Sequence, residues 1–272
     1  MIKITDADYR LPIIQALVPL DTFETSANKP ILISGVDADN GERGEYVVKF
    51  KRAERMSEEA CMRELLASFI ALQMEIPVVM PAIVNIIPPF VETLKGKDIY
   101  SVAAKSLGYN YGSDYIRTHS TIPTNQSLNN HQLEFAQTIF CFDVFIQNTD
   151  RTQNKPNMIT DGKEIVILDH EIAFGFVFDF AFAQNPQAWV IREQDMQWVN
   201  QHVLLSKIKG QAYDYNIFLS KLGNLDNAFW GRAFELIPAE WRNEQFDRIK
   251  AFLTSICDHK EEFIVELKKL ML

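Results

Sequence analysis

A chain of 272 residues with 47% hydrophobic residues is long enough for one large or two small domains with a filled core. Its formal net charge of −9 disfavours nonspecific binding to nucleic acid, which needs a basic surface. The longest apolar runs are short and broken by prolines, so we expect no membrane-spanning helix, and the first residues lack the pattern of a secretory signal. We therefore expect a cytoplasmic globular protein without nucleic-acid or membrane partners.

The first half of the sequence alternates strand and turn signals. The runs KPILISGV and EYVVKF flank the polar segment DADNGERG, which predicts a hairpin. A helix is expected from about Ser57 to Glu75, because Ser57 can cap its first turn and apolar residues recur at helical spacing. A further strand is expected near DIYSVAAKSL, residues 98–107.

The second half begins with a polar segment, residues 117–131, which predicts a surface loop. A helix is expected from about Leu133 to Gln147. The runs NMIT and KEIVILD then flank Asp161-Gly162, and an Asp-Gly pair between such runs predicts a hairpin with a two-residue turn. The chain after Phe180 is expected to be rich in helices. The three cysteines, Cys61, Cys141 and Cys257, lie far apart and favour buried, reduced thiols.

Carboxylates and amides gather around the second hairpin. Asp150 lies in the loop before it, and the hairpin should bring Asn157 at its entry close to Asp169 at its exit. Carboxylate and amide oxygens are ligands that Mg²⁺ prefers, with positions left open for phosphate oxygens. Arg151 is expected to support the loop by pairing with a carboxylate, and the buried Asp143 is expected to hydrogen-bond the same loop.

Lys49 is a candidate partner for nucleotide phosphates, because it is a charged residue within the apolar run EYVVKF. Such a lysine needs a carboxylate, and Glu64 on the following helix is the expected one, with Glu59 as the alternative. Lysine on a strand, glutamate on the next helix, an aspartate in a loop and a second aspartate after a hairpin form the order of parts in a protein kinase-like site. His170 and Glu171 are expected to point to opposite faces of a strand, so no zinc site is predicted there.

Four motifs occur in one order over roughly residues 30–180: YVVKF, KSLGYNYGSDYI, DVFIQNTDRTQNKPNMI and VILDHEIAF. Together they resemble the HipA-like kinase family, in particular its compact stand-alone domains, and more distantly the phosphoinositide kinases. The resemblance implies that Asp150 is the catalytic aspartate, that Asp169 binds metal, and that Lys49, paired with Glu64, binds phosphate.

The sequence departs from the better-known pattern of protein kinases at two places. The asparagine expected five positions after the catalytic aspartate is replaced by Lys155, which leaves Asn157, or alternatively Asn154, as the amide that binds metal. The loop with Gly41 and Gly44 is expected to cover the nucleotide phosphates, but it has no G-x-G-x-x-G pattern. Its acidic residues, Asp37, Asp39 and Glu42, would repel a triphosphate.

The resemblance implies an α+β bilobal protein kinase-like fold. We expect a strand-rich N-terminal lobe over residues 1–105, a helical C-terminal lobe over residues 106–272, and ATP with Mg²⁺ between them. The expected reaction is transfer of the γ-phosphoryl group to a hydroxyl, Ser or Thr of an unidentified protein substrate. The alternatives are a pseudokinase that acts as a binding or regulatory module, favoured by Lys155 and the acidic loop, and a small-molecule phosphotransferase of the aminoglycoside or choline type.

Overall fold

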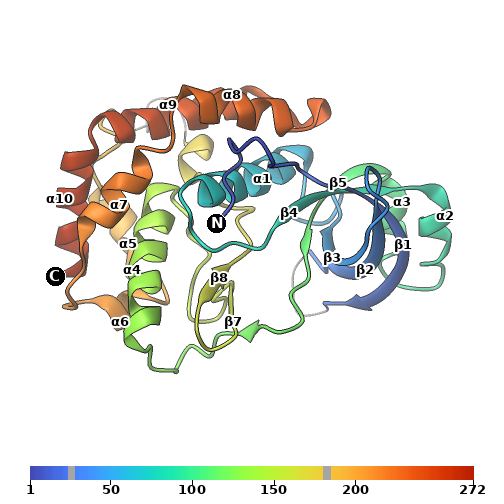
Figure 1. The fold of residues 1–272 in the computed structure, drawn as a ribbon, viewed down its shortest axis with the longest axis horizontal. Helices are drawn as coiled ribbons and strands as arrows, with labels where there is room; N and C mark the ends of the chain where they lie inside the picture. Colours follow the sequence, from blue (N-terminus) through green and yellow to red (C-terminus); the bar gives the residue numbers. More distant parts are fainter. Residues whose placement is uncertain (24–27, 180–184) are drawn as a thin grey trace.

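A closed five-stranded sheet forms one end of the molecule (Figure 1). The structure is a computed structural model that describes residues 1–23, 28–179 and 185–272. The sheet has the order β1-β2-β3-β5-β4 and closes through parallel pairing of β1 with β4. Its strands are β1 (Ile13–Thr22), β2 (Ile31–Asp37), β3 (Arg43–Lys49), β4 (Pro81–Ile86) and β5 (Gly108–Asp114).

The predicted hairpin of residues 29–50 is present as β2 and β3. The two strands pair antiparallel from Ile31 opposite Val48 to Val36 opposite Arg43. Ile31, Ile33 and Val48 are buried inside the closed sheet, as alternation along a strand with one buried face requires.

The prediction of a strand near residues 98–107 is wrong. This segment forms the helix α3 (Tyr100–Lys105), which is preceded by the helix α2 (Pro88–Glu92). Ile99 and Ala103, four residues apart, both bury against the closed sheet, a spacing that suits a helix. The chain enters the sheet only afterwards, as β5, so the closed sheet includes residues up to Asp114.

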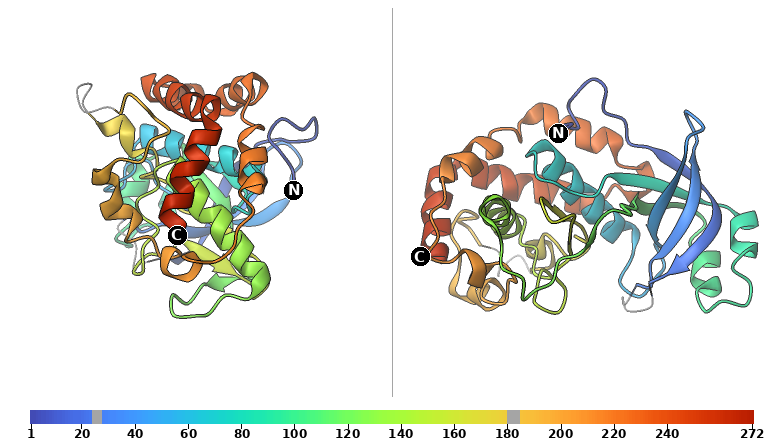
Figure 2. Two further views of the ribbon diagram at one scale, coloured as in Figure 1. Left: turned by 90° about the vertical axis from the view of Figure 1, so that its left-hand side faces the viewer. Right: turned by 60° about the horizontal axis from the view of Figure 1, so that its bottom comes forward.

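The helix expected after Ser57 is present as α1 (Glu58–Gln73), and the Ser57 side chain accepts a hydrogen bond from the Ala60 backbone N–H. Every residue from Ala60 to Gln73 is buried, so α1 is covered on all sides and not along one face. It lies between the closed sheet and the helical region (Figures 1 and 2). A polar side chain on such a helix must find a partner in the interior.

The second predicted hairpin is present with a longer turn. Strands β7 (Met158–Thr160) and β8 (Ile165–Ile167) pair antiparallel, with the short β6 (Ser120–Thr121) beside β7. Thr160 pairs with Ile165, which leaves a turn of residues 161–164 in place of the expected two-residue turn. The Asp161 carboxylate accepts hydrogen bonds from the backbone of Lys163 and Glu164, and this bonding stabilises the wider turn.

Helices dominate the rest of the chain, as predicted. They are α4 (Asn130–Phe145), α5 (Met196–Val199), α6 (Leu205–Ile208), α7 (Tyr215–Leu222), α8 (Asn227–Leu236), α9 (Glu244–Asp258) and α10 (Lys260–Met271), with short 3-10 turns at Gly175–Phe178, Glu193–Asp195 and Ala239–Trp241. In Figure 1, α7 and α10 lie beside α4 at the end of the molecule opposite the closed sheet. The described residues thus form a mixed α+β fold with a strand-rich region and a helical region.

The expectations about the cysteines and about membrane-spanning helices can be compared with the structure. Cys61 and Cys141 are buried free thiols, and Cys257 is free and half-buried. Among the helices of the described residues, none is long and apolar enough to span a bilayer.

Candidate active site

Lys49, the last residue of β3, is the centre of a buried cluster of charges. Its Nζ lies 2.9 Å from Glu64 Oε2, 2.6 Å from Asp169 Oδ1 and 3.2 Å from Glu171 Oε2. Burial alone would lower the pKa of Lys49, but the three carboxylates outweigh it and raise this pKa well above its ordinary value. The ammonium therefore stays charged inside the protein.

Glu64 is the α1 residue that joins this lysine to the segment after β8. One carboxylate oxygen accepts from Lys49 and the other accepts from the His170 backbone N–H at 3.0 Å. Burial raises the pKa of Glu64 to about 7. Of the two partners expected for Lys49, Glu64 makes the ion pair, whereas Glu59 is exposed at the start of α1.

The hairpin brings Asn157 and Asp169 together, as expected. The Leu168 backbone N–H donates to the Asn157 carbonyl at 3.1 Å, directly before Asp169. Both residues have left-handed backbone conformations, with φ of 46° and 63°, which Asn and Asp tolerate better than most residues. Nδ2 of Asn157 is buried and has no hydrogen-bond partner among the described residues. Asn154, in contrast, is exposed and lines a separate hollow of the helical region.

Asp150 lies in the loop between α4 and β7 and pairs with Lys155. The Lys155 ammonium is 3.3 Å from each carboxylate oxygen of Asp150. The loop turns back on itself between them, because the backbones of Thr152 and Lys155 hydrogen-bond each other in both directions. The position where the better-known kinase pattern has asparagine thus holds a lysine, whose ammonium contacts the candidate catalytic aspartate.

A buried network beneath this loop holds it to both α4 and the hairpin. Arg151 is fully buried, pairs with Asp143 of α4, donates to the Asn157 carbonyl, and lies 3.2 Å from His170 Nε2. His202 Nε2 lies 3.0 Å from the same Asp143 carboxylate. Burial would raise the pKa of Asp143, but Arg151 and His202 hold it well below its usual range. The predicted carboxylate partner of Arg151 is therefore Asp143.

A cavity of about 430 Å³ opens beside Lys49, Glu64 and Asp169. Its wall combines residues of the closed sheet, of α1 and of the β6-β7-β8 sheet. The apolar part of the wall includes Val47, Val79, Ile116, Ile159 and Leu168. An apolar chamber with charges gathered at one place has the character of a small-molecule or cofactor site.

A sequence model described as HipA-like kinase matches residues 37–263 of the chain. The chain belongs to the HipA-like kinase family. Membership supports kinase-type phosphoryl transfer as the class of activity. A search of curated proteins finds no match to this HipA-like kinase.

Two solved structures resemble this HipA-like kinase at low similarity. The Helicobacter pylori proinflammatory kinase CtkA has 12% sequence identity and a TM-score of 0.46, and the match covers 96% of this chain and 97% of that one. The Neurospora crassa PAN3 pseudokinase has 11% identity and a TM-score of 0.35, and the match covers 92% of this chain and 64% of that one.

The glycines expected at the nucleotide are not at the cavity. Gly41 and Gly44 belong to the turn and strand at the far end of β3 from Lys49, and neither lines the cavity. The five residue-to-residue steps of extended strand from Gly44 to Lys49 span roughly 17 Å. The cavity wall instead contains Phe23 and Pro30, which flank the connection between β1 and β2.

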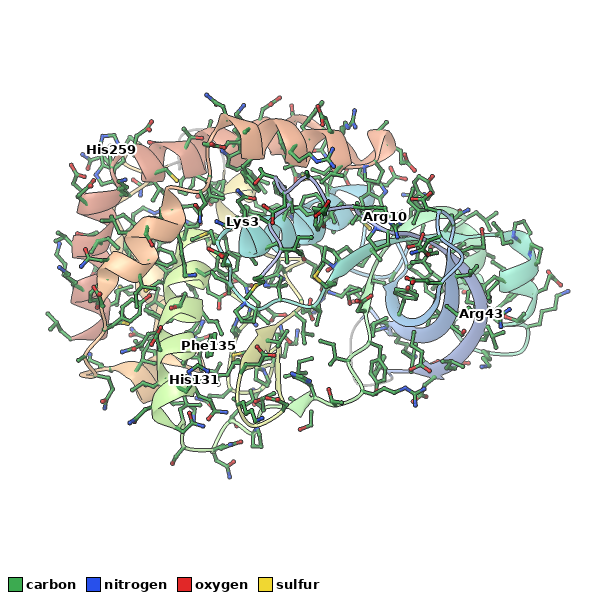
Figure 3. All side chains as sticks on the ribbon, viewed as in Figure 1. Lys3, Arg10, Arg43, His131, Phe135 and His259 are labelled. Carbon is green, nitrogen blue, oxygen red and sulfur yellow. The ribbon has the colours of Figure 1, made fainter. Side chains whose placement is uncertain are left out.

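The acidic residues of the β2-β3 turn are likewise away from the cavity. Asp37 forms two hydrogen bonds with Arg10, and Asp39 forms one. Figure 3 labels Arg10 next to the closed sheet. The Arg10 hydrogen bond lowers the pKa of Asp37, so this carboxylate is neutralised by a partner that the sequence pattern did not indicate. None of Asp37, Asp39 and Glu42 lines the cavity.

Glu171 is a member of the cluster that the sequence did not indicate. Besides Lys49, it accepts from Asn28 Nδ2 at 2.6 Å, and so links the β1-β2 connection to the segment after β8. The expectation that residues 170 and 171 alternate across a strand fails because β8 ends at Ile167. The only sequence feature that pointed to Glu171 was its position close to Asp169.

Proposed function

We propose that this HipA-like kinase binds ATP with Mg²⁺ in the cavity beside Lys49 and transfers the γ-phosphoryl group to a Ser or Thr hydroxyl of a protein. The strand-rich and helical regions act as the two lobes of a kinase. The observation that supports this most strongly is the contact of Lys49 with both Glu64 and Asp169, residues separated from it by 15 and 120 positions.

The cavity supplies two kinds of contact for a nucleotide. Its apolar side chains suit a flat base, while the buried ammonium of Lys49 suits phosphate oxygens. Glu64 and Glu171 hold this ammonium in place at 2.9 and 3.2 Å, so its position is fixed before a nucleotide arrives.

The residues around Lys49 also fit a divalent cation. One oxygen each of Glu64, Asp169 and Glu171 lie within 4.8 Å of one another, and one ammonium faces all three carboxylates. The unpartnered amide of Asn157 adds a polar group next to Asp169, and the oxygen and nitrogen of an amide exchange places on rotation. Asp169 and Asn157 would hold Mg²⁺, which supplies positive charge to the phosphate oxygens when bound.

We assign Asp150 the role of accepting the proton of the acceptor hydroxyl. In the proposed transfer, the hydroxyl oxygen bonds to the γ-phosphorus, the bond from this phosphorus to the bridging oxygen breaks, ADP leaves, and Asp150 takes the hydroxyl proton. Lys155 contacts Asp150, and its ammonium stabilises the negative charge that develops during the transfer. The buried Arg151–Asp143 pair keeps the loop in position.

A pseudokinase is the second candidate, and the Lys155–Asp150 pair is the observation that favours it. An ammonium in contact with both carboxylate oxygens competes with a substrate hydroxyl for Asp150. Such a protein would bind nucleotide without transferring phosphate.

Phosphate transfer from γ-labelled ATP to dephosphorylated casein separates the two candidates. We expect transfer by the wild-type chain and a loss of about a hundredfold or more in kcat for Asp150→Asn, with ATP affinity unchanged. Asp161→Asn, in the turn of residues 161–164, is the matched control and should retain transfer. ATP binding with no transfer to casein or to the protein itself would favour the pseudokinase.

A further inference from the structure

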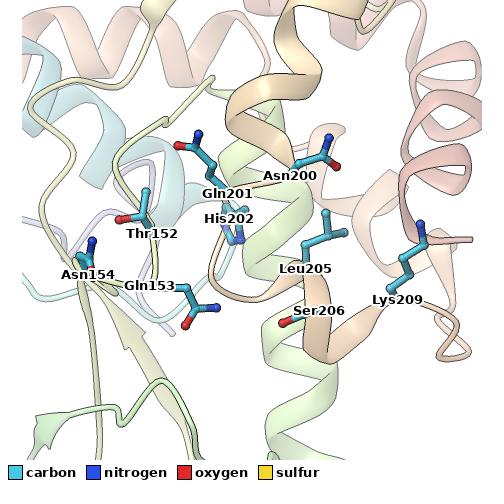
Figure 4. A pocket seen from close by; sticks show the side chains of 9 residues that line it. All are labelled: Thr152, Gln153, Asn154, Asn200, Gln201, His202, Leu205, Ser206 and Lys209. Atoms are coloured by element: carbon cyan, nitrogen blue, oxygen red, sulfur yellow. The ribbon is translucent and has the colours of Figure 1, made fainter.

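A second hollow, of about 530 Å³, lies in the helical region next to the Asp150 loop. Figure 4 shows it between residues 152–154 on one side and residues 200–209 on the other. Its volume falls within the range of about 300–1,000 Å³ that is usual for ligand sites. The proposed ATP site shares none of its lining residues.

The lining of the hollow is rich in groups that bind peptide backbone. An amide side chain both donates and accepts hydrogen bonds, as a peptide group does. Most of the lining consists of such amides and of hydroxyls: Thr152, Gln153, Asn154, Asn200, Gln201 and Ser206. Asn154, Asn200, Gln201 and Ser206 form no side-chain hydrogen bond within the described part of the chain, so these groups are available to a ligand.

The charge of the hollow is opposite to that of the whole protein. The chain carries a net charge of −9, yet no Asp or Glu stands among the described residues that line the hollow. Lys209 is its cation, and this exposed side chain makes no ion pair with a described residue. A ligand with a carboxylate near Lys209 would therefore be attracted and not repelled.

The hollow is held at a fixed place relative to Asp150. Thr152 follows Asp150 by two residues, which span at most about 7 Å of chain. Thr152 also forms a β-bridge with His202, and His202 is bonded to the buried Asp143 that anchors Arg151. Because one buried network supports both the loop and the floor of the hollow, a segment bound there has a defined distance to Asp150.

We propose that this hollow binds an extended segment of the polypeptide substrate, with an acidic side chain of that segment paired to Lys209. The amides bind the backbone of the segment, and the neighbouring Ser or Thr hydroxyl reaches Asp150. This inference deepens the proposed function and rests on it, because a docked segment matters to the reaction only if Asp150 acts on a protein hydroxyl.

Binding to a peptide array tests the docking site without requiring phosphate transfer. The probe is a set of nine-residue peptides with a central Ser, in which each flanking position in turn is Asp, Lys or Ala among neutral residues. The wild-type chain should prefer Asp at one position, by about fivefold. Lys209→Glu should reverse the preference to Lys at that same position, whereas Lys97→Glu, an equal charge change on an exposed residue of the strand-rich region, should keep the wild-type preference.

Circular dichroism and ATP affinity of Lys209→Glu should match those of the wild-type chain, which shows that the variant is folded. The proposal is overturned if the folded protein binds no peptide, shows no charge preference, or keeps its preference in Lys209→Glu. Peptides that bind with the acidic preference but accept no phosphate would support the docking site and contradict the proposed kinase function.

Discussion

Lys49 shows why the identity of a single residue says little until its partners are known. On the sequence it is a charged residue in an apolar strand, a pattern that also fits a solvent-exposed edge position. In the structure its ammonium is buried against three carboxylates drawn from α1 and from the segment after β8. A buried cation with several acidic partners is a feature of functional sites more often than of surfaces.

Lys155 contacts the candidate catalytic aspartate, so its effect on phosphate transfer separates the two candidate functions. Because its ammonium contacts Asp150, we expect Lys155→Ala to lower kcat about tenfold or more by removing a cation near the transferred group. Its side chain is about half exposed, so the free energy of unfolding should change by no more than about 0.5 kcal/mol. Kinetics of phosphate transfer and urea denaturation measure the two effects.

The control for this prediction is Lys163→Ala, an exposed lysine in the turn of residues 161–164. A Lys155→Asn variant that transfers phosphate faster than the wild-type chain would contradict the prediction, because it would show that the lysine impairs the site.

His202 makes the stability of the loop dependent on pH. Burial lowers the pKa of His202 below its ordinary value, although Asp143 partly opposes this, and its Nδ1 accepts from the Leu204 backbone N–H, a bond that protonation breaks. The unfolded chain therefore binds the proton more readily, so the stability contribution is complete above about pH 6.5 and is lost as the pH falls below it.

Urea denaturation of the wild-type chain and of His202→Gln between pH 8 and pH 5 tests this linkage. The wild-type free energy of unfolding should fall with pH more steeply than that of His202→Gln, by at most about 1.4 kcal/mol per pH unit. His131→Gln, at an exposed histidine of α4, should leave the wild-type slope unchanged. Equal slopes for the wild-type chain and His202→Gln would refute the assignment.

Among the elements, those with strong local signals were predictable. The β2-β3 hairpin and α1 followed from the polar turn between apolar runs and from Ser57 as a cap. The strand expected near residues 98–107 was wrong because burial against the closed sheet, and not local sequence, decides the conformation there. Helix propensity and strand propensity are weak when a tertiary contact competes with them.

The closed sheet requires small residues where its strands approach closely. A Cβ on Gly112 of β5 would lie 2.4 Å from Val84 Cγ2 of β4, and Val84 is fully buried. We expect Gly112→Ala to destabilise the protein by about 1–3 kcal/mol through overpacking. Thermal denaturation measures the change.

Gly231 of α8 provides the comparison, because a Cβ there meets no atom within 4 Å. Gly231→Ala should be neutral or stabilise by up to about 1 kcal/mol, since alanine favours a helix over glycine. If the two substitutions shift the melting temperature equally, the close approach of β4 and β5 has no energetic effect and this account of the sheet fails.

At the scale of the whole molecule, the sequence indicated several residues that the fold brings together, but not the surface that surrounds them. Lys49, Glu64, Asn157 and Asp169 stand in the expected order, and the fold brings their segments together across the chain. The contribution of Asn28 and Glu171 depends on a contact between residues 143 positions apart, which no local pattern contains. Gly41 and Gly44 were assigned to the nucleotide by comparison with the glycine-rich loop of kinases, and the sheet places them at the opposite end of β3 from Lys49.

The most direct test of the kinase-type site is calorimetric titration of the wild-type chain and Asp169→Ala with ATP, each with and without Mg²⁺. Our account predicts that the wild-type chain binds ATP tightly only with Mg²⁺, and that Asp169→Ala, shown to be folded by circular dichroism, loses this dependence together with most of the affinity. Absence of ATP binding by the folded wild-type chain, or equal binding by Asp169→Ala, would contradict the account.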